Sequence, residues 1–551
     1  MKNKLLNSIA TWVICAVLFG ITGWFCYSFQ PSWDFAYGGT WWILWVYVSL
    51  GIMMIVAPFV SDRDYFDSEE TFMTFMKTLL VPLILAVVTL ITIAIMSICN
   101  GAMTSSNKYF AFVKDRVTVT NESVLPDIIG EDGDTSKIAI IEDTEAFKKA
   151  NAVLAEGSLG NKNSINEESL TSQEINGKFI YTLSLQPNSW FKWEGKTKGY
   201  ITIDRNTGET NLIKDEFVYS IDAKYGNLIF HGTDNVKKLL ISTYGGKWVD
   251  IDMELNDDSK PYWVATKVTQ SGVGGYTKVL QVATVDPFTG ETKTYNIGEE
   301  PEWIERVYPE DVMLEYLGYY GKYIHGWVNS WKTGNDVLDV TEGYNIVYID
   351  GTPHVWTGLT THNASNNASV GVAICNLKTG KITIYKNSGI SEQHAQNSAM
   401  GLVQEKGYNA SFPVILNING ETSYFMLLRD DNSNVQGYAF VSYKDYTKAA
   451  FGTTVKEALV AYKSKLNTTS STEDMANKEE LSTTGIVTAI GSEVVDGRTV
   501  YYVKIEGSDK VFSLQSGVNI DVVFLKLGDT VTFKYYKTNA VVVSVNAMSI
   551  N

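Results

Sequence analysis

Three long stretches near the start of the chain contain no charged residue: residues 5–33, 35–61 and 78–107. Each stretch includes a mostly apolar run close to the roughly 20 residues that a helix needs to cross a bilayer core. The pattern therefore predicts three transmembrane helices, at residues 9–27, 41–60 and 78–99.

Lysine and arginine residues beside these runs predict their orientation. Lys2 and Lys4 precede the first run, and Arg63 and Lys77 follow the second, whereas residues 28–40 contain neither type. Because basic loops stay on the cytoplasmic side, we expect a cytoplasmic amino terminus and an extracytoplasmic region from about residue 100 onward. A cleaved signal peptide is the alternative for the first run, but bulky aromatic residues follow it where cleavage requires small ones.

Beyond residue 100 the pattern changes to short alternating runs bounded by turn residues, which is typical of β-strands. A turn of the form Asp/Asn-x-x-Thr-Gly recurs in this region, and its glycines are Gly208, Gly290 and Gly380. The Asp or Asn side chain caps such a turn, and the glycine supplies the positive φ that it needs. We therefore predict repeated units, each with a strand, a loop, a second strand, this turn and a third strand.

A fourth, degenerate copy begins at Asn419-Gly420 and lacks the Thr-Gly turn. Helical patterns separate or follow the copies, at residues 310–331, 391–406 and 455–466. Glycines interrupt the first of these, which predicts two short helices. Thr454 and Glu457 form a capping box at the start of the last one.

A helix followed by an aromatic meander that closes in Asp-x-x-Thr-Gly-Glu resembles the PepSY family of small extracytoplasmic α+β modules. The matching segments are residues 177–214, 260–297, 351–385 and, more loosely, 412–446. PepSY-type modules are associated with membrane-anchored regulators, and some of them restrain secreted peptidases. The resemblance therefore implies a membrane-anchored regulator. Residues 297–451 also resemble multi-pass membrane proteins of low-GC bacteria and their mobile elements.

A polar segment at residues 467–483 is typical of a flexible linker, and short strands follow it. Asp496-Gly497 marks a hairpin turn among them. The region from residue 484 to 551 resembles small OB-like or SH3-like β-barrels. An OB-like barrel suggests nucleic-acid binding, but six basic and six acidic residues balance in this region. We therefore expect no nucleic-acid partner.

Together these patterns predict a membrane-anchored α+β protein: three transmembrane helices, then repeated antiparallel β-meander plus helix modules, then a small C-terminal β-barrel. The expected domains are an anchor at 1–100, a connecting region at 101–175, PepSY-like repeats at 176–466, the linker at 467–483 and the barrel at 484–551.

The composition limits the partners of the outer region. The chain has 551 residues and a formal net charge of −16, nearly all of it beyond residue 100. A generally polyanionic partner is therefore disfavoured. Cys375 is the one cysteine of that region, so no intramolecular disulfide can form there. The region must be stabilised by its own apolar cores, which its length allows.

Candidate chemistry is sparse along the chain. The sequence has no G-x-S-x-G elbow, phosphate-binding loop or H-E-x-x-H pair, and its histidines, none at metal-site spacing, are His231, His325, His354, His362 and His394. We interpret these histidines as packing or surface residues, and Cys375 as a buried thiol. Asp430 begins a loop that lacks the Gly and Glu of a calcium site. Tyrosines at 319–323 could stack on a sugar or peptide, but helical spacing favours a core role.

Two function classes remain. The first is a non-catalytic, membrane-anchored extracytoplasmic binding or scaffold protein of the bacterial cell envelope, which contacts the bilayer through residues 9–99 and presents β-rich modules to a protein or cell-wall partner. Under this interpretation we expect no residue with a catalytic, cofactor-binding or metal-binding role. The alternative is an envelope enzyme, a hydrolase or peptidase regulator, whose site converges only in the fold. Two or more buried acid or base groups that meet in a cleft would favour the enzyme.

Overall fold

The computed structural model describes residues 87–121, 141–188, 196–221, 234–361, 368–467, 480–495, 498–515, 520–536 and 542–550, with parts of 13–51 and residue 84. The chain divides into two compact units, Met1–Lys463 and Ser464–Asn551.

The predicted membrane-anchored fold with three transmembrane helices is wrong. In the part of the chain that the structure describes, no single helix is long and apolar enough to cross a membrane. One bent pair, Val87–Asn100 and Ala102–Arg116, meets the length and composition test together, with a 46° angle between its halves. The predicted helices at 9–27 and 41–60 lie largely outside the described residues, as do residues 78–83, 85 and 86 of the predicted helix at 78–99.

The bend has a local cause at Gly101. The hydroxyl of Thr104 donates to the carbonyl of Ile98, and that of Ser105 donates to the carbonyl of Cys99 at 2.8 Å. Ser105 also leaves the helical region, with φ of −123° and ψ of 19°. Side-chain hydrogen bonds to the preceding turn bend helices, so the apolar run does not continue as one straight helix.

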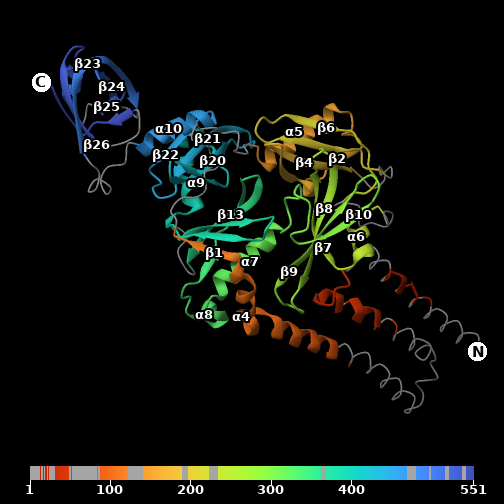
Figure 1. Cartoon of the computed structure of the whole chain (residues 1–551). Helices are drawn as coiled ribbons and strands as arrows, with labels where there is room; N and C mark the ends of the chain where they lie inside the picture. Colours follow the sequence, from red (N-terminus) through yellow and green to blue (C-terminus); the bar gives the residue numbers. More distant parts are fainter. Residues whose placement is uncertain are drawn as a thin grey trace, which may run out of the picture. The chain divides into compact units, whose positions relative to one another are not determined.

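Antiparallel meanders form four sheets in the described part of the first unit (Figure 1). The first contains β3 (Thr171–Ile175), β4 (Lys178–Pro187), β5 (Tyr200–Asp204) and β6 (Thr210–Ile213), with β2 (Asn163–Ile165) also on β4. The second contains β7 (Lys247–Leu255), β8 (Pro261–Gln270), β9 (Thr277–Val285) and β10 (Thr292–Asn296).

The third sheet contains β12 (Asn345–Ile349), β13 (Thr352–Thr361), β15 (Gly371–Asn376) and β16 (Ile382–Tyr385). At its edges, β11 (Leu338–Val340) pairs with β13 and β1 (Val117–Thr120) runs parallel to β16. The fourth contains β19 (Val414–Ile418), β20 (Glu421–Arg429), β21 (Val435–Ser442) and β22 (Ala449–Gly452), with β18 (Asn409–Ala410) on β20. A separate two-stranded pair joins β14 (Ala368–Ser369) to β17 (Gly389–Ile390).

Helices precede each sheet in the chain. They are α5 (Asp143–Glu156), α6 (Val236–Tyr244), α7 (Glu310–Tyr323) with α8 (Gly326–Lys332), and α9 (Glu392–Gly401). The predicted break within residues 310–331 is confirmed, because α7 and α8 are separate. After the fourth sheet comes α10 (Val455–Asn467), whose Glu457 N–H donates to the Thr454 hydroxyl at 3.2 Å. This bond confirms the predicted cap.

The Thr-Gly turn has one geometry in the first three sheets and closes the last hairpin of each. Gly208, Gly290 and Gly380 have φ of 74°, 73° and 67°. Their N–H groups donate to the carbonyl of the Asp or Asn four residues earlier, at 2.8, 2.9 and 3.0 Å. The side chain of that Asp or Asn accepts two further backbone N–H groups in each copy. The predicted turn and its glycine conformation are confirmed.

A second turn recurs, and the sequence interpretation singled out only its copy at Asn419-Gly420. It joins β3 to β4, β12 to β13 and β19 to β20, at Asn176-Gly177, Asp350-Gly351 and Asn419-Gly420, where both residues have positive φ. Two-residue hairpins with positive φ at both positions favour Asn-Gly and Asp-Gly. The sequence therefore contained the signal for these hairpins, as two Asn-Gly pairs and one Asp-Gly pair between apolar runs.

Gly290→Ala should destabilise the protein more than Gly177→Ala. Both substitutions place a Cβ at positive φ, which costs about 1–2 kcal/mol. A Cβ on Gly290 would also lie 2.3 Å from the Tyr219 ring, whereas no atom lies within 4 Å of one on Gly177. Urea unfolding of both variants measures the difference, and equal losses would contradict the tight packing of Tyr219 on this turn.

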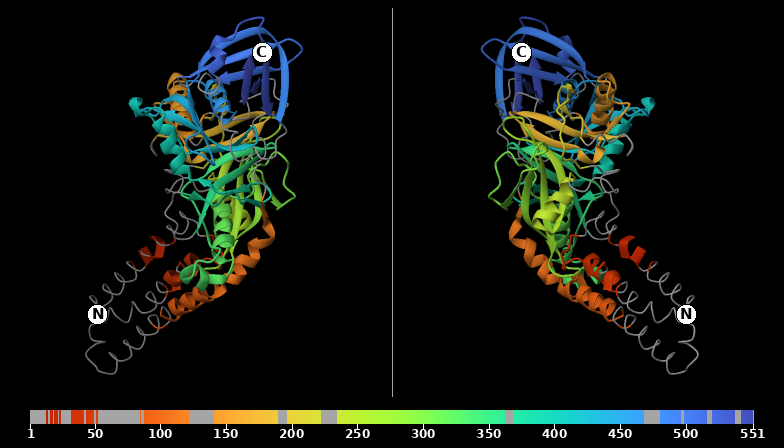
Figure 2. Two further views of the ribbon diagram at one scale, coloured as in Figure 1. Left: turned by 90° about the vertical axis from the view of Figure 1, so that its left-hand side faces the viewer. Right: turned by 90° about the vertical axis from the view of Figure 1, so that its right-hand side faces the viewer.

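The four sheets contact one another around a common centre, with α4 (Ala102–Val113) on one side of them (Figures 1 and 2). One strand of each sheet lies there: β3 contacts β7, β12 contacts β19, and Tyr348 on β12 donates to Ser172 on β3 at 2.9 Å. An ion pair between Arg429 on β20 and Glu142 before α5 joins the fourth sheet to the first. The layout is like that of propeller blades, which surround a shared axis.

The second unit contains a single described sheet of β23 (Glu480–Val495), β24 (Arg498–Ile505), β25 (Val511–Gln515), β26 (Thr530–Tyr536), β27 (Val542–Ser544) and β28 (Ala547–Ile550). The strand order is β27-β25-β24-β23-β26-β28, with β25 and β27 parallel. Because β23 is long, its two halves pair with different strands, β26 and β24. Phe512 and Phe533 pack at its core with their rings 4.7 Å apart.

Candidate functional site

Buried ionisable side chains gather where β3, β7 and the segment before α7 meet. Asp252 and Glu254 alternate with apolar residues along β7 and are 7% and 0% exposed, and Glu305 and Arg306 are 7% and 8% exposed. A bulge distorts β7 between Val249 and Asp252, and bulges often re-aim side chains next to functional sites. We call Gln173, Glu174, Asp252, Glu254, Glu305 and Arg306 the acidic joint.

Hydrogen bonds in the acidic joint run between separate elements of the chain. The carboxylate of Glu305 accepts the Glu174 N–H of β3 at 3.1 and 3.3 Å. Oε2 of Glu254 on β7 accepts the Glu305 N–H at 3.1 Å and the Gln173 side-chain amide at 3.4 Å. The Leu255 N–H in turn donates to Oε1 of Gln173 at 2.6 Å. The first sheet, the second sheet and the segment before α7 are therefore fastened to one another here.

Arg306 supplies positive charge to the acidic joint. Its Nη1 lies 2.9 Å from Oε1 of Glu310, at the start of α7, and 3.6 Å from Oδ2 of Asp252. The hydroxyl of Tyr344, just before β12, donates to Oε2 of Glu310 at 3.0 Å. Burial alone would lower the pKa of Arg306, but the charges of Glu310 and Asp252 outweigh it and raise this pKa above its ordinary value. The third sheet joins the network through Tyr344.

Burial shifts the titration of the carboxyl groups upward. Burial, followed by the charge of Glu254, raises the pKa of Glu305 to about 9, and burial raises the pKa of Glu254 to about 7. Burial also raises the pKa of Asp250 to about 6, and it raises that of Asp252 well above its usual range. Removal from water disfavours the charged form of a carboxyl group, so protonated carboxyls persist in the joint near neutral pH.

The acidic joint brings acid and base groups together, as an enzyme would require, but the groups are enclosed. The side chains of Glu254 and Glu305 are bonded to the backbone and side chains of β3 and the pre-α7 segment, and a substrate would have to displace β3 to reach them. Sequence reasoning missed the joint because its members are separated by up to 133 residues (306 − 173). The one local signal was the alternation Asp250-Ile251-Asp252-Met253-Glu254.

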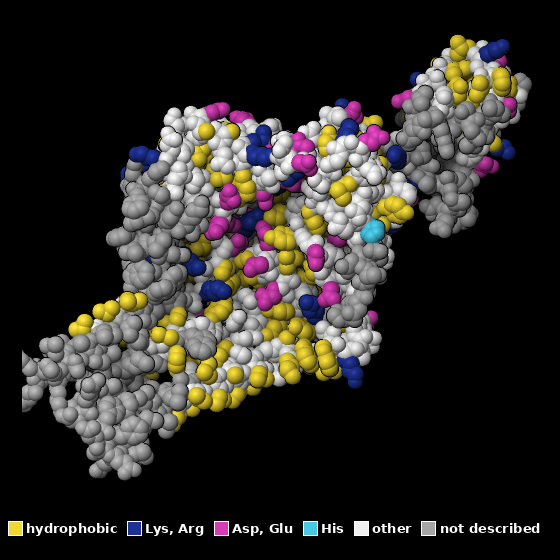
Figure 3. Space-filling view, turned by 180° about the vertical axis from the view of Figure 1, so that it is seen from behind, with side chains coloured by type: hydrophobic (Ala, Val, Ile, Leu, Met, Phe, Trp, Pro, Cys, Tyr) yellow, Lys and Arg dark blue, Asp and Glu magenta, His cyan; other side chains and the backbone are white. Residues whose placement is uncertain are grey.

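Aromatic side chains are exposed elsewhere, on the short helix α8. The rings of Trp327 and Trp331 stack with centroids 5.8 Å apart and an angle of 9°. Trp331 is 71% exposed and Val328 is 63% exposed. The Trp327 N–H donates to the Ser106 hydroxyl of α4 at 3.0 Å, which fixes α8 on α4. Figure 3 shows hydrophobic side chains along this edge of the unit.

The histidines singled out in the sequence do not come together among the described residues. His354 is held by the Thr352 carbonyl and the Asn376 side chain, and burial lowers its pKa. His394 lies 3.2 Å from the Ser391 hydroxyl at the start of α9, and His325 pairs with Asp336 at the surface. His231 and His362 lie outside the described residues. No group of three or more metal-ligating side chains occurs within the ranges that the structure describes.

The other candidates have structural roles. Cys375 is 0% exposed and burial raises its pKa to about 12, which confirms a buried thiol. Asp430 accepts the backbone N–H groups of Asn432 and Asn434 and forms an exposed hairpin tip. Tyr319 and Tyr323 pack their rings on Tyr109 of α4. The core interpretation of these tyrosines is therefore confirmed.

No family model and no curated protein matches the sequence. The expected PepSY-like character is therefore unsupported, and no repeat family is identified.

Solved structures give only remote likenesses. A β-fructofuranosidase of Bombyx mori is 11% identical with a TM-score of 0.19, over 74% of this chain and 70% of that one. An α-L-arabinofuranosidase from Lactobacillus brevis is 8% identical with a TM-score of 0.17, over 61% and 83%. A mutant apocarotenoid oxygenase of Synechocystis is 9% identical with a TM-score of 0.13, over 50% and 47%. At such low scores these likenesses carry no argument about fold or activity.

Proposed function

We propose that the protein is a non-catalytic binding or scaffold protein that holds a protein partner against α8. The supporting observation is the exposed Trp331, which stacks in parallel on the half-buried Trp327 beside the exposed Val328. Tryptophan is enriched among the residues that dominate protein–protein binding energy. Exposed apolar patches on a folded protein mark interaction sites.

The way α8 is held favours a preformed contact surface. The Ser106 hydroxyl accepts the Trp327 N–H, and α8 packs between α4 and α7. A side chain that is already ordered loses less conformational entropy when a partner binds. Trp331 can therefore contribute its full ring face to an interface.

The acidic joint supports the non-catalytic part of the proposal. Its carboxylates accept hydrogen bonds from Glu174, Glu305 and Gln173, and its arginine bridges Asp252 and Glu310. Groups engaged in this way stabilise contacts between sheets. Acid–base catalysis needs a group within hydrogen-bond reach of a substrate. Because these carboxyl groups are buried, a substrate cannot contact them without moving β3.

Site-specific photocrosslinking of the full-length chain in the cells that produce it tests the proposal. A photoreactive amino acid at position 331 should capture one recurring protein. Trp327→Ala should reduce that capture at least tenfold, since removing a tryptophan hot spot costs about 2 kcal/mol or more. The same photoreactive residue at Tyr446, an aromatic position 57% exposed in the turn between β21 and β22, serves as the matched control.

Two results would overturn the proposal. Equal capture at positions 331 and 446 would mean that α8 is not a specific surface. Substrate turnover by the purified chain, abolished in Glu254→Gln or Asp252→Asn but preserved in Trp331→Ala, would replace binding with the enzyme alternative.

A further inference from the structure

We propose that the Glu254 and Glu305 carboxyl groups hold at least one proton at neutral pH, and that losing it at alkaline pH loosens the contact of β3 with β7 and the pre-α7 segment. The proposal concerns the acidic joint and is independent of what binds to α8.

The hydrogen bonds of Glu254 support a protonated carboxyl group. This side chain is 0% exposed, and its Oε2 accepts two donors. Its Oε1, although buried, has no partner in the described part of the chain. An ionised carboxylate with an unpaired oxygen away from water is strongly unfavourable. A proton on this group removes the charge and with it most of that penalty.

The acidic groups around the pair also favour a bound proton, and the charge of Arg306 opposes them. Carboxyl groups reach the joint from every neighbouring element, and they are Glu174 on β3, Asp250 and Asp252 on β7, and Glu310 and Asp311 on α7. Tyr348 on β12 also interacts electrostatically with Glu305, and with Arg306 and Arg205. Arg306 is bonded to Glu310 and Asp252. Its single charge is thus divided among several acids, and like charges in one site disfavour full ionisation.

The connections of Glu305 determine what loosens. Its side chain accepts the Glu174 N–H of β3, while its own N–H donates to Glu254 on β7. When both carboxyl groups are ionised, two negative charges repel each other across the point where β3, β7 and the pre-α7 segment join. The strain falls on the hydrogen bonds made by the backbone of Glu174, Glu305 and Leu255.

The pH range follows from the direction of the shifts. The pKa of Glu305 is about 9 and that of Glu254 is about 7, both above the ordinary 4.5. The folded chain therefore binds more protons than the unfolded chain between about pH 4.5 and 9. The associated stability is complete below about 4.5 and is lost as the pH rises through about 7 and then 9.

Hydrogen–deuterium exchange of the full-length chain between pH 6 and 9, corrected for intrinsic rates, tests the inference. Peptides covering residues 171–178, 250–256 and 302–308 should lose protection in the wild type, on the order of tenfold per pH unit for each proton released. Glu305→Gln should remove most of this pH dependence and should be protected at least as well as the wild type at pH 6. Glu254→Gln should also remove most of the pH dependence. This second variant tests the inference if Glu305→Gln does not fold.

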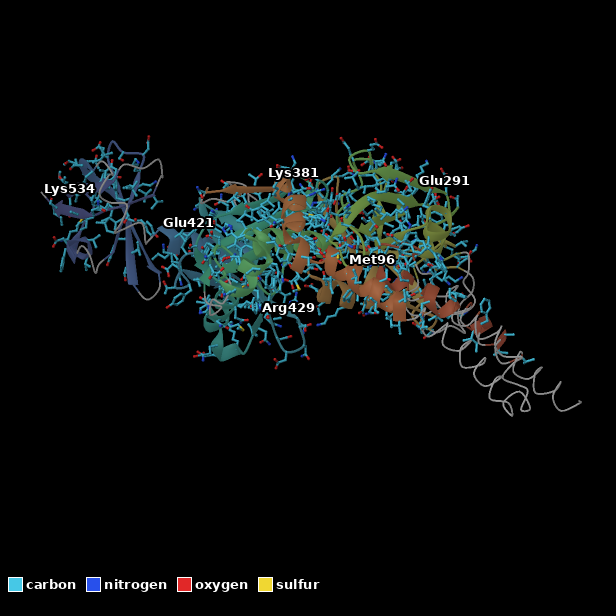
Figure 4. The ribbon with its side chains drawn as sticks, turned by 90° about the horizontal axis from the view of Figure 1, so that it is seen from below. Met96, Glu291, Lys381, Glu421, Arg429 and Lys534 are labelled. Atoms are coloured by element: carbon cyan, nitrogen blue, oxygen red, sulfur yellow. The ribbon has the colours of Figure 1, made fainter. Side chains whose placement is uncertain are left out.

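The control is Glu291→Gln, an exposed glutamate of the second sheet, whose position Figure 4 labels. It should keep the pH dependence of the wild type. The inference is wrong if these three peptides lose no more protection than the rest of the chain at pH 9. It is also wrong if both glutamine variants retain the wild-type pH dependence.

Discussion

Replacing Arg306 by alanine is expected to lower the free energy of unfolding by about 3–5 kcal/mol at pH 7, the usual loss when one partner of a buried ion pair is removed. Arg306 is 8% exposed and bridges Asp252 and Glu310. Without it, two carboxyl groups remain in a buried site that has lost its bonded cation. Urea unfolding followed by circular dichroism measures the loss.

The pH dependence of this loss provides an internal check. At pH 5 more of the carboxyls around Arg306 are protonated, because burial raises the pKa of Asp252 and of its neighbour Asp250. The loss caused by Arg306→Ala should therefore shrink as the pH falls. Lys322→Ala is the control, since its pair with Asp339 is long, at 3.9 Å, and half exposed, and such pairs contribute about 0–1 kcal/mol. Equal losses in the two variants would contradict the role of the joint.

Trp263→Ala is expected to destabilise the first unit by about 3–5 kcal/mol, the range for removing a large aromatic side chain from a core. Trp263 is 0% exposed in the core of the second sheet, and its indole N–H donates to the Tyr219 carbonyl at 2.8 Å. Alanine leaves both a cavity and an acceptor without its donor. Thermal and urea unfolding report the loss.

Trp331→Ala is the matched control for Trp263→Ala. The ring of Trp331 is 71% exposed, so removing it should change the free energy of unfolding by no more than about 0.5 kcal/mol. The same pair of variants separates stability from binding, because Trp331→Ala is expected to weaken the binding of a captured partner to the purified chain. A large loss of stability in Trp331→Ala would show that α8 is part of the core rather than a contact surface.

Short-range features were predictable because neighbouring residues decide them. The turn glycines at 208, 290 and 380 follow from the positive φ that a tight reversal imposes, and all three have it. The cap at Thr454 and the break between α7 and α8 are likewise local. Each depends on hydrogen bonds that span only a few residues, so the sequence interpretation and the structure agree.

The helices predicted to cross a membrane show where an apolar pattern alone was insufficient. A run without charges from residue 78 to 107 satisfies the length criterion. Among the described residues, however, the helix in this run spans only Val87–Asn100, and just beyond the predicted span the chain bends at Gly101, where the hydroxyls of Thr104 and Ser105 donate to the preceding turn. The bend depends on which backbone carbonyls those hydroxyls reach, and hydropathy does not record that choice.

The amino-acid sequence by itself contains the alternation of β7, which lies outside the predicted units, but it does not determine the surroundings of the polar face of this strand. Asp250, Asp252 and Glu254 alternate with apolar residues, as on a strand with one face in water. The tertiary structure instead covers this face with β3 and the segment around Glu305, separated from β7 by about 50 to 80 residues. The two-residue period of a strand determines on which face each side chain lies. Whether that face is buried depends on which distant segments pack on it. The acidic joint was therefore decided by the fold.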